Sequence, residues 1–263
     1  GWRCEMNQRT QAFVALILAF SLLWIPVGQH TFLVPHWMKV GTFMAPFLLL
    51  VALATRSDPS TPGYRDPQVL SVIMLCAYIL HQFEEHWIDL TGAQYAFYGY
   101  VNSVIQTAVG APNSLEFLGP EAIFVINTSL VWMVGAFAIV FARERSFPFF
   151  CMAAIMVVNA ISHIAAALAS SAYNPGLATS VFVFLPIGLF AFYTRLAAGR
   201  RKILASLIWA VLAHVVMIGG IIAVKMMNLF SEAVYFGLLV AMSVLPAVLF
   251  RAEEGDGDEP MRL

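Results

Sequence analysis

The sequence is poor in charged residues, which make up only 11% of its 263 residues, whereas 60% are hydrophobic. A soluble domain carries about 25% charged residues, so this composition, with a mean hydropathy of +0.81, excludes water as the main solvent of the surface. The net charge of −1 provides no basic surface, and we expect no nucleic-acid partner. The three cysteines, Cys4, Cys76 and Cys151, lie far apart without a C-x-x-C pattern, which excludes a zinc–thiolate site and a disulfide framework.

Long apolar runs are what the sequence has in abundance. They recur at about 20 residues, the length that a helix needs to cross a hydrocarbon core of about 30 Å. Backbone amides in lipid must pair within the protein, which leaves helices or a closed barrel, and continuous rather than alternating apolar residues favour helices. The first run is followed by Gln29, His30 and Pro35 without a small-x-small cleavage pattern, so we expect a retained helix rather than a signal peptide.

We therefore predict an all-α fold, a polytopic transmembrane helical bundle of about eight spans. Residues 1–252 form this single domain, and the acidic tail at 253–263 is predicted to be disordered. The Pro-rich segment 56–68 is a predicted surface loop. The aromatic-rich segment 91–120 is a predicted membrane-interface loop or short lid helix rather than a further span. The predicted spans are 12–34, 38–55, 69–90, 121–142, 148–170, 177–195, 203–224 and 232–250.

The distribution of basic residues predicts the orientation of this bundle. Of the 14 Lys and Arg residues, only Lys39 and Lys225 fall on the side opposite the two termini. An excess of Lys and Arg marks the cytoplasmic side of a membrane protein. We therefore expect an integral, multi-pass protein of the lipid bilayer with both termini in the cytoplasm.

The third predicted span ends in LCAYILHQFEEHWIDL, which places His81, Glu84 and Glu85 within roughly a 100° arc of one helix face. Two acids and a histidine are costly in lipid, at about 2.5–3.5 kcal/mol for a central acid on insertion scales. One interpretation is a solvated helix end, where Glu85, His86 and Asp89 reach headgroups or water. We favour a metal site or proton-transfer site that faces the bundle interior, because His81 and Glu84 lie on the apolar side of that end.

A second polar set lies in the fifth predicted span, where Asn159 and His163 are spaced i, i+4 and share a helix face. Spans three and five both run outward, so we expect these residues at the depth of His81 and Glu85, in the outer half of the bilayer. Asn127, near the outer start of the fourth span, falls at a similar depth. A lone buried histidine is commonly just hydrogen-bonded, but three spans that bring polar groups to one level indicate a shared site.

The fifth span closes in Tyr173-Asn174-Pro175-Gly176, which predicts a type I or type II turn with Pro at its second position. This local structure suffices to explain the residues. We also hypothesise that the turn holds the roof of the site.

Three motifs in this order resemble the HXXEE family of membrane proteins: His81-x-x-Glu84-Glu85, the later Asn159-x-x-x-His163, and the Tyr-x-Pro-Gly turn. The resemblance extends over roughly residues 70–200 of the chain. It implies that these five His, Glu and Asn residues act together, and it supplies no reaction.

The favoured function is a membrane metalloenzyme that acts on a lipophilic small-molecule substrate by hydrolysis or oxidation. His81 and Glu85, at i and i+4, can bind one divalent ion, Zn or Fe. His163 can complete three protein ligands and leave a position open for water or substrate. Glu84 is expected to be a further metal ligand or the general base, and the remaining predicted catalytic residues are Asn127 and Asn159.

Two alternatives use the same polar residues. A metal-free acid–base isomerase or cyclase of an isoprenoid or sterol-like substrate would use a desolvated glutamate as proton donor, with Trp87 stabilising a cationic intermediate. A proton- or cation-coupled transporter would bind ions at the carboxylates, although polar groups gathered in one half of the bilayer disfavour a transport path. His214 lies in the seventh span without a polar neighbour at helical spacing and is interpreted as a core histidine. The alternative is that, at mid-depth, it reaches the cavity.

Overall fold

The computed structural model describes residues 32–56, 60, 62–142, 146–195 and 199–249. Within these ranges every element of regular secondary structure is a helix, apart from one isolated β-bridge between Ile88 and Gln94. The predicted all-α fold is therefore confirmed. Predicted span 12–34, except for its last three residues, and the tail at 253–263 lie outside the described residues.

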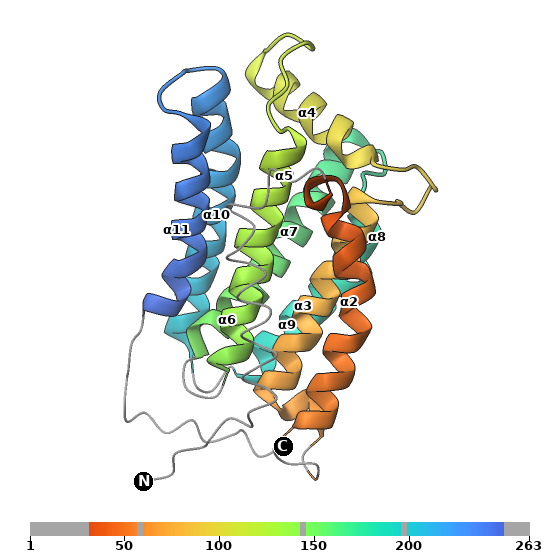
Figure 1. Cartoon of the computed structure of the whole chain (residues 1–263), viewed down its shortest axis with the longest axis vertical. Coiled ribbons are helices and arrows are strands. Elements are labelled where there is room, and N and C mark those ends of the chain that lie inside the picture. Colours follow the sequence, from red (N-terminus) through yellow and green to blue (C-terminus); the bar gives the residue numbers. More distant parts are fainter. Residues whose placement is uncertain (1–31, 57–59, 61, 143–145, 196–198, 250–263) are drawn as a thin grey trace.

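The long helices lie side by side and run nearly along the long axis of the molecule (Figure 1). Two of the predicted spans are continuous rods whose middle turns are π-helical, so each carries three labels in sequence. The elements are α2 (Leu33–Thr55), η1 (Gly63–Arg65), α3 (Pro67–His86), α4 (Ala96–Val109), α5 (Pro120–Ile126), η2 (Asn127–Met133), α6 (Val134–Val140), α7 (Ser146–Ser170), α8 (Leu177–Thr179), η3 (Ser180–Phe184), α9 (Leu185–Thr194), α10 (Arg200–Lys225) and α11 (Glu232–Val248).

Five of the described helices are long and apolar enough to cross a membrane: α2, the α5–η2–α6 rod, α7, the α8–η3–α9 rod and α10. They coincide with the predicted spans 38–55, 121–142, 148–170, 177–195 and 203–224. The predicted spans 69–90 and 232–250 are also helices, α3 and α11. However, α3 has a polar second half, and α11 has only 17 residues.

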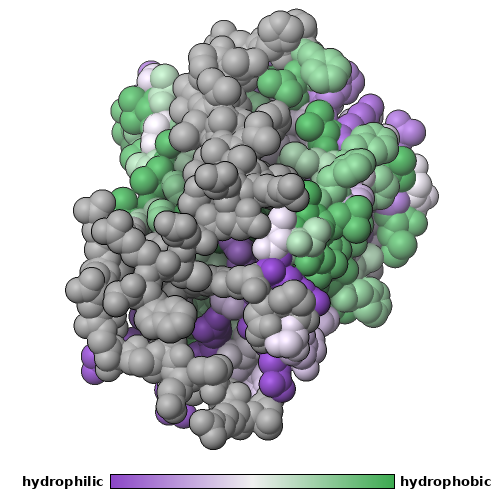
Figure 2. Space-filling view, turned by 60° about the horizontal axis from the view of Figure 1, so that its bottom comes forward, coloured by the Kyte–Doolittle hydropathy of each residue, from purple (hydrophilic) through white to green (hydrophobic). Residues whose placement is uncertain are grey.

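The outward faces of the bundle are apolar. On α2, Phe43, Phe47 and Leu50 are exposed, and on α10 the same holds for Leu204 and Ile208. Figure 2 shows hydrophobic residues gathered on both flanks of the molecule, on the side of α2 and on the opposite side. Apolar surface on this scale marks contact with another apolar phase, which agrees with the low charge of the sequence.

Helix α7 forms the centre of the described bundle, in contact with α3, α6, α9, α10 and α11. The α10–α11 hairpin and the α2–α3 pair lie on opposite sides of the rod that contains α5 and α6 (Figure 1). Side chains of α7 are therefore placed to meet those of α3 inside the bundle, and this places the candidate site.

The predicted interface segment 91–120 contains a short helix, α4, of 14 residues. At about 1.5 Å per residue it is roughly 21 Å long, too short for a hydrocarbon core of about 30 Å. Its Asn102 accepts hydrogen bonds from the backbone N–H groups of Phe117 and Leu118 and donates to the Leu118 carbonyl. Helix α4 is thereby fixed over the end of the bundle at which α3 ends (Figure 1).

Close packing of α9 on α7 supplies a test of the bundle. A Cβ on Gly188 would lie 2.7 Å from the Val157 side chain and 3.2 Å from the Ala153 carbonyl oxygen. We predict that Gly188→Ala lowers the free energy of unfolding by about 1–3 kcal/mol, the range for overpacking, measured by thermal unfolding in detergent. Gly99→Ala, in α4 with no atom within 4 Å, is the control and should be neutral or stabilising. Equal unfolding temperatures for wild type and Gly188→Ala would contradict this packing.

Candidate metal centre

Helix α3 carries the HXXEE residues in its last two turns. It starts at Pro67 after Asp66, whose carboxylate accepts a hydrogen bond from the Gln68 N–H, a favourable start for a helix. Near its other end, His81 and Glu85 lie one turn apart and are 0% and 5% exposed. His86 is also 5% exposed, so the solvated-helix-end interpretation fails for Glu85 and His86.

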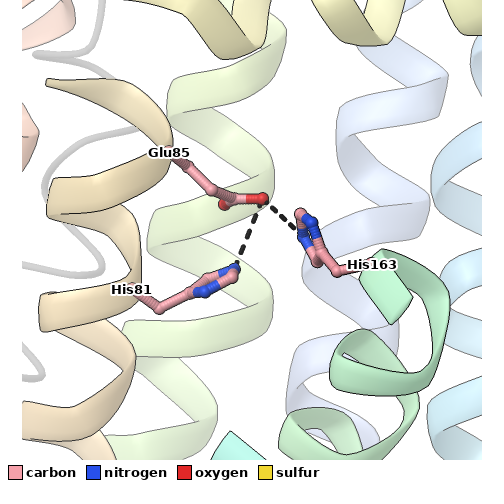
Figure 3. Close-up of side chains that lie close together, drawn as sticks. All are labelled: His81, Glu85 and His163. Carbon is pink, nitrogen blue, oxygen red and sulfur yellow. Dashed lines mark ion pairs between the residues drawn. The ribbon is translucent and has the colours of Figure 1, made fainter. Parts of the chain in front are cut away.

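The structure brings His81, Glu85 and His163 together (Figure 3). Glu85 Oε1 lies 3.3 Å from His81 Nε2 and 2.9 Å from His163 Nε2, which comes from α7. The potential ligand atoms of the three residues all lie within 4.8 Å of one another. These are three of the four predicted metal ligands, contributed by two helices.

Hydrogen bonds on the far side of His81 fix its tautomer. Its Nδ1 lies 2.7 Å from Thr179 Oγ1. The Thr179 hydroxyl is 2.5 Å from Glu84 Oε2 and 3.2 Å from the Gly176 carbonyl, and both of these oxygens can only accept. Thr179 therefore donates its proton to one of them and accepts the Nδ1–H of His81. In the neutral ring, Nε2 is left with an unprotonated lone pair directed at Glu85.

The tautomer of His163 is fixed in the same way by Asn174. His163 Nδ1 lies 2.6 Å from Asn174 Oδ1, and Asn174 Nδ2 donates to the His163 carbonyl at 3.0 Å. The amide nitrogen of Asn174 is identified by its hydrogen bond to the His163 carbonyl, which can only accept. The other amide atom is therefore the oxygen, and it must accept the Nδ1–H of His163. The neutral ring therefore also presents a bare Nε2.

Two imidazole lone pairs and a carboxylate oxygen thus converge in the interior of the bundle. His81 Nε2 is fully buried and makes no hydrogen bond, although polar atoms that are buried in proteins almost always have partners. Only a positive species between these atoms, a proton or a metal cation, makes the arrangement favourable.

The Tyr-x-Pro-Gly turn closes one side of this cluster. The Leu177 N–H donates to the Asn174 carbonyl at 3.0 Å, and Gly176 has φ +94° and ψ −11°. These values identify a type II turn, with Pro175 second and Gly176 third. A Cβ on Gly176 would lie 2.8 Å from side-chain carbons of His81, Glu85 and His163. Only glycine fits at this position, and the turn lies directly against the site, as hypothesised from the sequence.

Glu84 lies outside the three-residue cluster. Its carboxylate accepts four hydrogen bonds: from the Tyr173 hydroxyl at 2.7 Å, the Ala178 N–H at 3.1 Å, the Thr179 N–H at 2.7 Å and the Thr179 hydroxyl at 2.5 Å. Burial raises the pKa of Tyr173 above its ordinary value, as does its hydrogen bond to Glu84, so its hydroxyl stays a donor. Glu84 thus connects α3 to the start of α8 and holds the Thr179 that orients His81.

Asn127 lies in a separate polar chain behind Glu85. Trp132 Nε1 donates to Gln82 Oε1 at 2.9 Å, and Gln82 Nε2 donates to Asn127 Oδ1 at 3.0 Å. Asn127 Nδ2 lies 3.3 Å from His86 Nε2, which is 3.2 Å from Glu85 Oε2. This chain reaches the second oxygen of Glu85, the one that does not face His81 and His163. Asn127 opens η2, and π-helical turns are frequent at functional sites.

A cavity of about 320 Å³ borders the cluster. Its walls are mostly apolar, and Glu85 and His163 contribute to them. Asn159 also lines the cavity and donates from Nδ2 to the Tyr78 hydroxyl at 2.9 Å. His214 lines the same cavity from α10, so of its two sequence interpretations the structure shows the one in which it reaches the cavity.

Several residues of the site were missed by the sequence analysis. Thr179 lies in an apolar rod and Gln82 lies among the polar residues of α3, and a single hydroxyl or amide gives no periodic signal. Asn174 and Gly176 were noted only as turn residues. The signal that could have identified Asn174 is its place eleven residues after His163, at the next point where the chain returns to the same depth.

Fold and site together define a class: an all-helical protein with membrane-length apolar helices and a buried His/Glu cluster between α3 and α7. Residues 72–191 match the model of a family described as "Protein of unknown function with HXXEE motif". This segment of the chain is thus an HXXEE-family region, and the resemblance inferred from the sequence is confirmed. No curated protein and no solved structure matches the chain.

The four donors around Glu84 generate a prediction. In Glu84→Gln, one carboxylate oxygen becomes an NH2 group that faces a donor, so a buried donor loses its partner. We expect the free energy of unfolding to fall by about 1–3 kcal/mol, measured by thermal unfolding in detergent. Glu232→Gln, which removes only an exposed ion pair to Lys225 at 3.4 Å, should change it by less than about 1 kcal/mol. If the two variants behave alike, Glu84 does not hold the α3–α8 junction.

Proposed function

We propose that the protein is a multi-pass membrane enzyme, with both termini in the cytoplasm, that binds one divalent metal ion at His81, Glu85 and His163 and acts on a lipophilic substrate. The observation that supports the metal most directly is the convergence of two Nε2 atoms on one carboxylate oxygen, while both Nδ1 atoms are engaged elsewhere. A cation in that position would satisfy all three atoms at once.

The set of ligands and their supports match what metal sites use. Two imidazoles and one carboxylate, with a position open toward the cavity, are the ligands of catalytic zinc and of non-haem iron. In such sites the other ring nitrogen of each histidine donates to a carboxylate, carbonyl or similar acceptor. Here Thr179 and Asn174 supply those acceptors, and Glu84 supports Thr179.

When bound, the metal would polarise a substrate oxygen or lower the pKa of a bound water. Hydrolysis and oxidation both remain within this proposal. The chain's own residues hold the ligands and exclude water: Gly176 closes one side, and the apolar cavity walls admit a lipophilic body. Asn159 and the Tyr78 hydroxyl face that cavity, where they can hydrogen-bond a reacting oxygen. The geometry favours Glu84 as a positioning residue over the metal ligand or base expected from the sequence.

One observation favours a second candidate, metal-free acid–base catalysis. Glu85 Oε1 lies 2.9 Å from His163 Nε2, a distance suited to a proton shared by the pair. A proton held there could be transferred to a substrate in the cavity, as an isomerase or cyclase requires. The two candidates differ in whether a metal is bound.

Metal analysis of purified protein tests the proposal. We expect about one Zn or Fe per chain after mild loading, and at least a tenfold loss of bound metal in His81→Ala, Glu85→Ala and His163→Ala. Loss of any one ligand leaves two, which is too few for a stable protein site. His214→Leu, on the same cavity but outside the cluster, is the control and should retain the metal. Metal well below one per chain in wild type would refute the metalloenzyme and leave the acid–base candidate.

The supports of the histidines generate a separate prediction. Thr179→Val and Asn174→Leu remove the acceptors of the two Nδ1–H groups and should weaken metal binding by about 10- to 100-fold, measured by competition with a chromogenic chelator. Thr179→Ser keeps the hydroxyl and should bind metal within a few-fold of wild type. An unchanged affinity in Thr179→Val would show that the tautomer of His81 is not set by this contact.

A further inference from the structure

His214 is an isolated polar residue in α10, the most apolar of the five membrane-length helices. Histidines are rare in such helices and commonly face an interior cavity. Its Nδ1 lies 2.8 Å from the Ala210 carbonyl, which can only accept, so Nδ1 carries the proton. The neutral ring therefore presents Nε2 as an acceptor, and that atom has no partner among the described residues.

The free acceptor of His214 belongs to the cavity beside the proposed metal site. His214, Met217 and Ile218 line it from α10, whereas Glu85 and His163 line it from α3 and α7. A molecule in the cavity would thus meet the Glu85–His163 edge and the His214 side chain, which three different helices contribute. The proposed function uses the Glu85–His163 edge, Asn159 and Tyr78 and gives no role to His214.

Several of the polar groups that line the cavity can accept a hydrogen bond. No Lys or Arg is among the described residues that line it, and Glu85 supplies a carboxylate. The Ser162 hydroxyl donates its proton to the Val158 carbonyl at 3.0 Å, so its oxygen presents lone pairs to the cavity. An ionised head group, such as a carboxylate, carries no proton to donate to these acceptors. A neutral group that carries an O–H finds acceptors.

The dimensions of the cavity restrict the apolar part of the ligand. Its volume of about 320 Å³ is at the low end of the roughly 300–1,000 Å³ of small-molecule sites. Val104 of α4 and Ser162 of α7 line the cavity and are both exposed, so the cavity opens to the surroundings beside them. A compact or partly inserted chain fits such a site, and a bulky polycyclic body does not.

We propose that this cavity binds a neutral lipophilic alcohol, whose hydroxyl donates to His214 Nε2 and whose body lies along the apolar walls. His214 is then the residue that distinguishes a hydroxyl from a group without a donor. As a statement about the substrate class, this rests on the proposed enzymatic function. As a statement about binding, it requires no metal.

A matched pair of probes tests the hydrogen bond. The first is a ten-carbon primary alcohol that carries a diazirine and an alkyne, and the second is its methyl ether, which lacks the O–H. Photolabelling is quantified on purified full-length protein in lipid nanodiscs, and labelled peptides are mapped by mass spectrometry. We expect the wild type to prefer the alcohol by roughly five- to tenfold, the effect of one net hydrogen bond, with label on peptides of α4, α7 or α10.

Variants assign the preference to His214. In His214→Leu the alcohol and the ether should label equally, and His214→Gln, which keeps an acceptor, should retain part of the preference. Met217→Leu alters the same wall without an acceptor and should behave as wild type. Unfolding temperatures of all four proteins show whether they are folded. Equal labelling by both probes in wild type, a preference that survives in His214→Leu, or label outside the cavity helices would overturn the proposal.

Metal content measured on the same samples separates this proposal from the proposed function. A preference for the alcohol in protein that binds no metal supports the alcohol site and refutes the metalloenzyme. Bound metal without the preference supports the metalloenzyme and overturns the alcohol site.

Discussion

The arrangement of Glu85 between the Nε2 atoms of His81 and His163 is the constraint on which the rest of the site depends. Three electron-rich atoms within 4.8 Å, buried among helices, are unfavourable unless a positive species lies between them. The surrounding residues hold the three atoms in this unfavourable arrangement. Thr179 and Asn174 engage the Nδ1 atoms of the two rings, which in neutral rings directs both Nε2 lone pairs inward, and Gly176 lies directly against the cluster.

The turn between α7 and α8 explains why two separated motifs form one site. Its Asn174 orients His163 of the preceding helix, and its Gly176 lies against His81 and Glu85 of α3. Directly after it, Thr179 connects His81 to Glu84. The α7–turn–α8 segment therefore holds both halves of the cluster, and all of these residues lie within the family match over residues 72–191.

Much of the fold and of the candidate site could be predicted from the sequence, because helices suited to lipid follow simple patterns of apolar and polar residues. Apolar runs and the polar interruptions in them indicate the helices, and helical periodicity with the alternating direction of spans brought His81, Glu85 and His163 to one depth. Helical periodicity could not decide whether Glu84 or Glu85 joins the two histidines, since neighbouring residues differ by only about 100° around the helix. The position of α8 decides which of the two carboxylates meets the cluster. Thr179 and Gln82 act through long-range hydrogen bonds, which leave no pattern along the chain. The π-helical turns at η2 and η3 likewise depend on packing rather than on local sequence.

The central claim is that His81, Glu85 and His163 bind a metal through both Nε2 atoms and one carboxylate. Zinc K-edge X-ray absorption on zinc-loaded protein in nanodiscs tests it most directly. We predict a first shell of nitrogen and oxygen at about 2.0–2.1 Å with outer-shell scattering from two imidazoles. A sulfur shell at about 2.3 Å, or a spectrum without imidazole scattering, would contradict it.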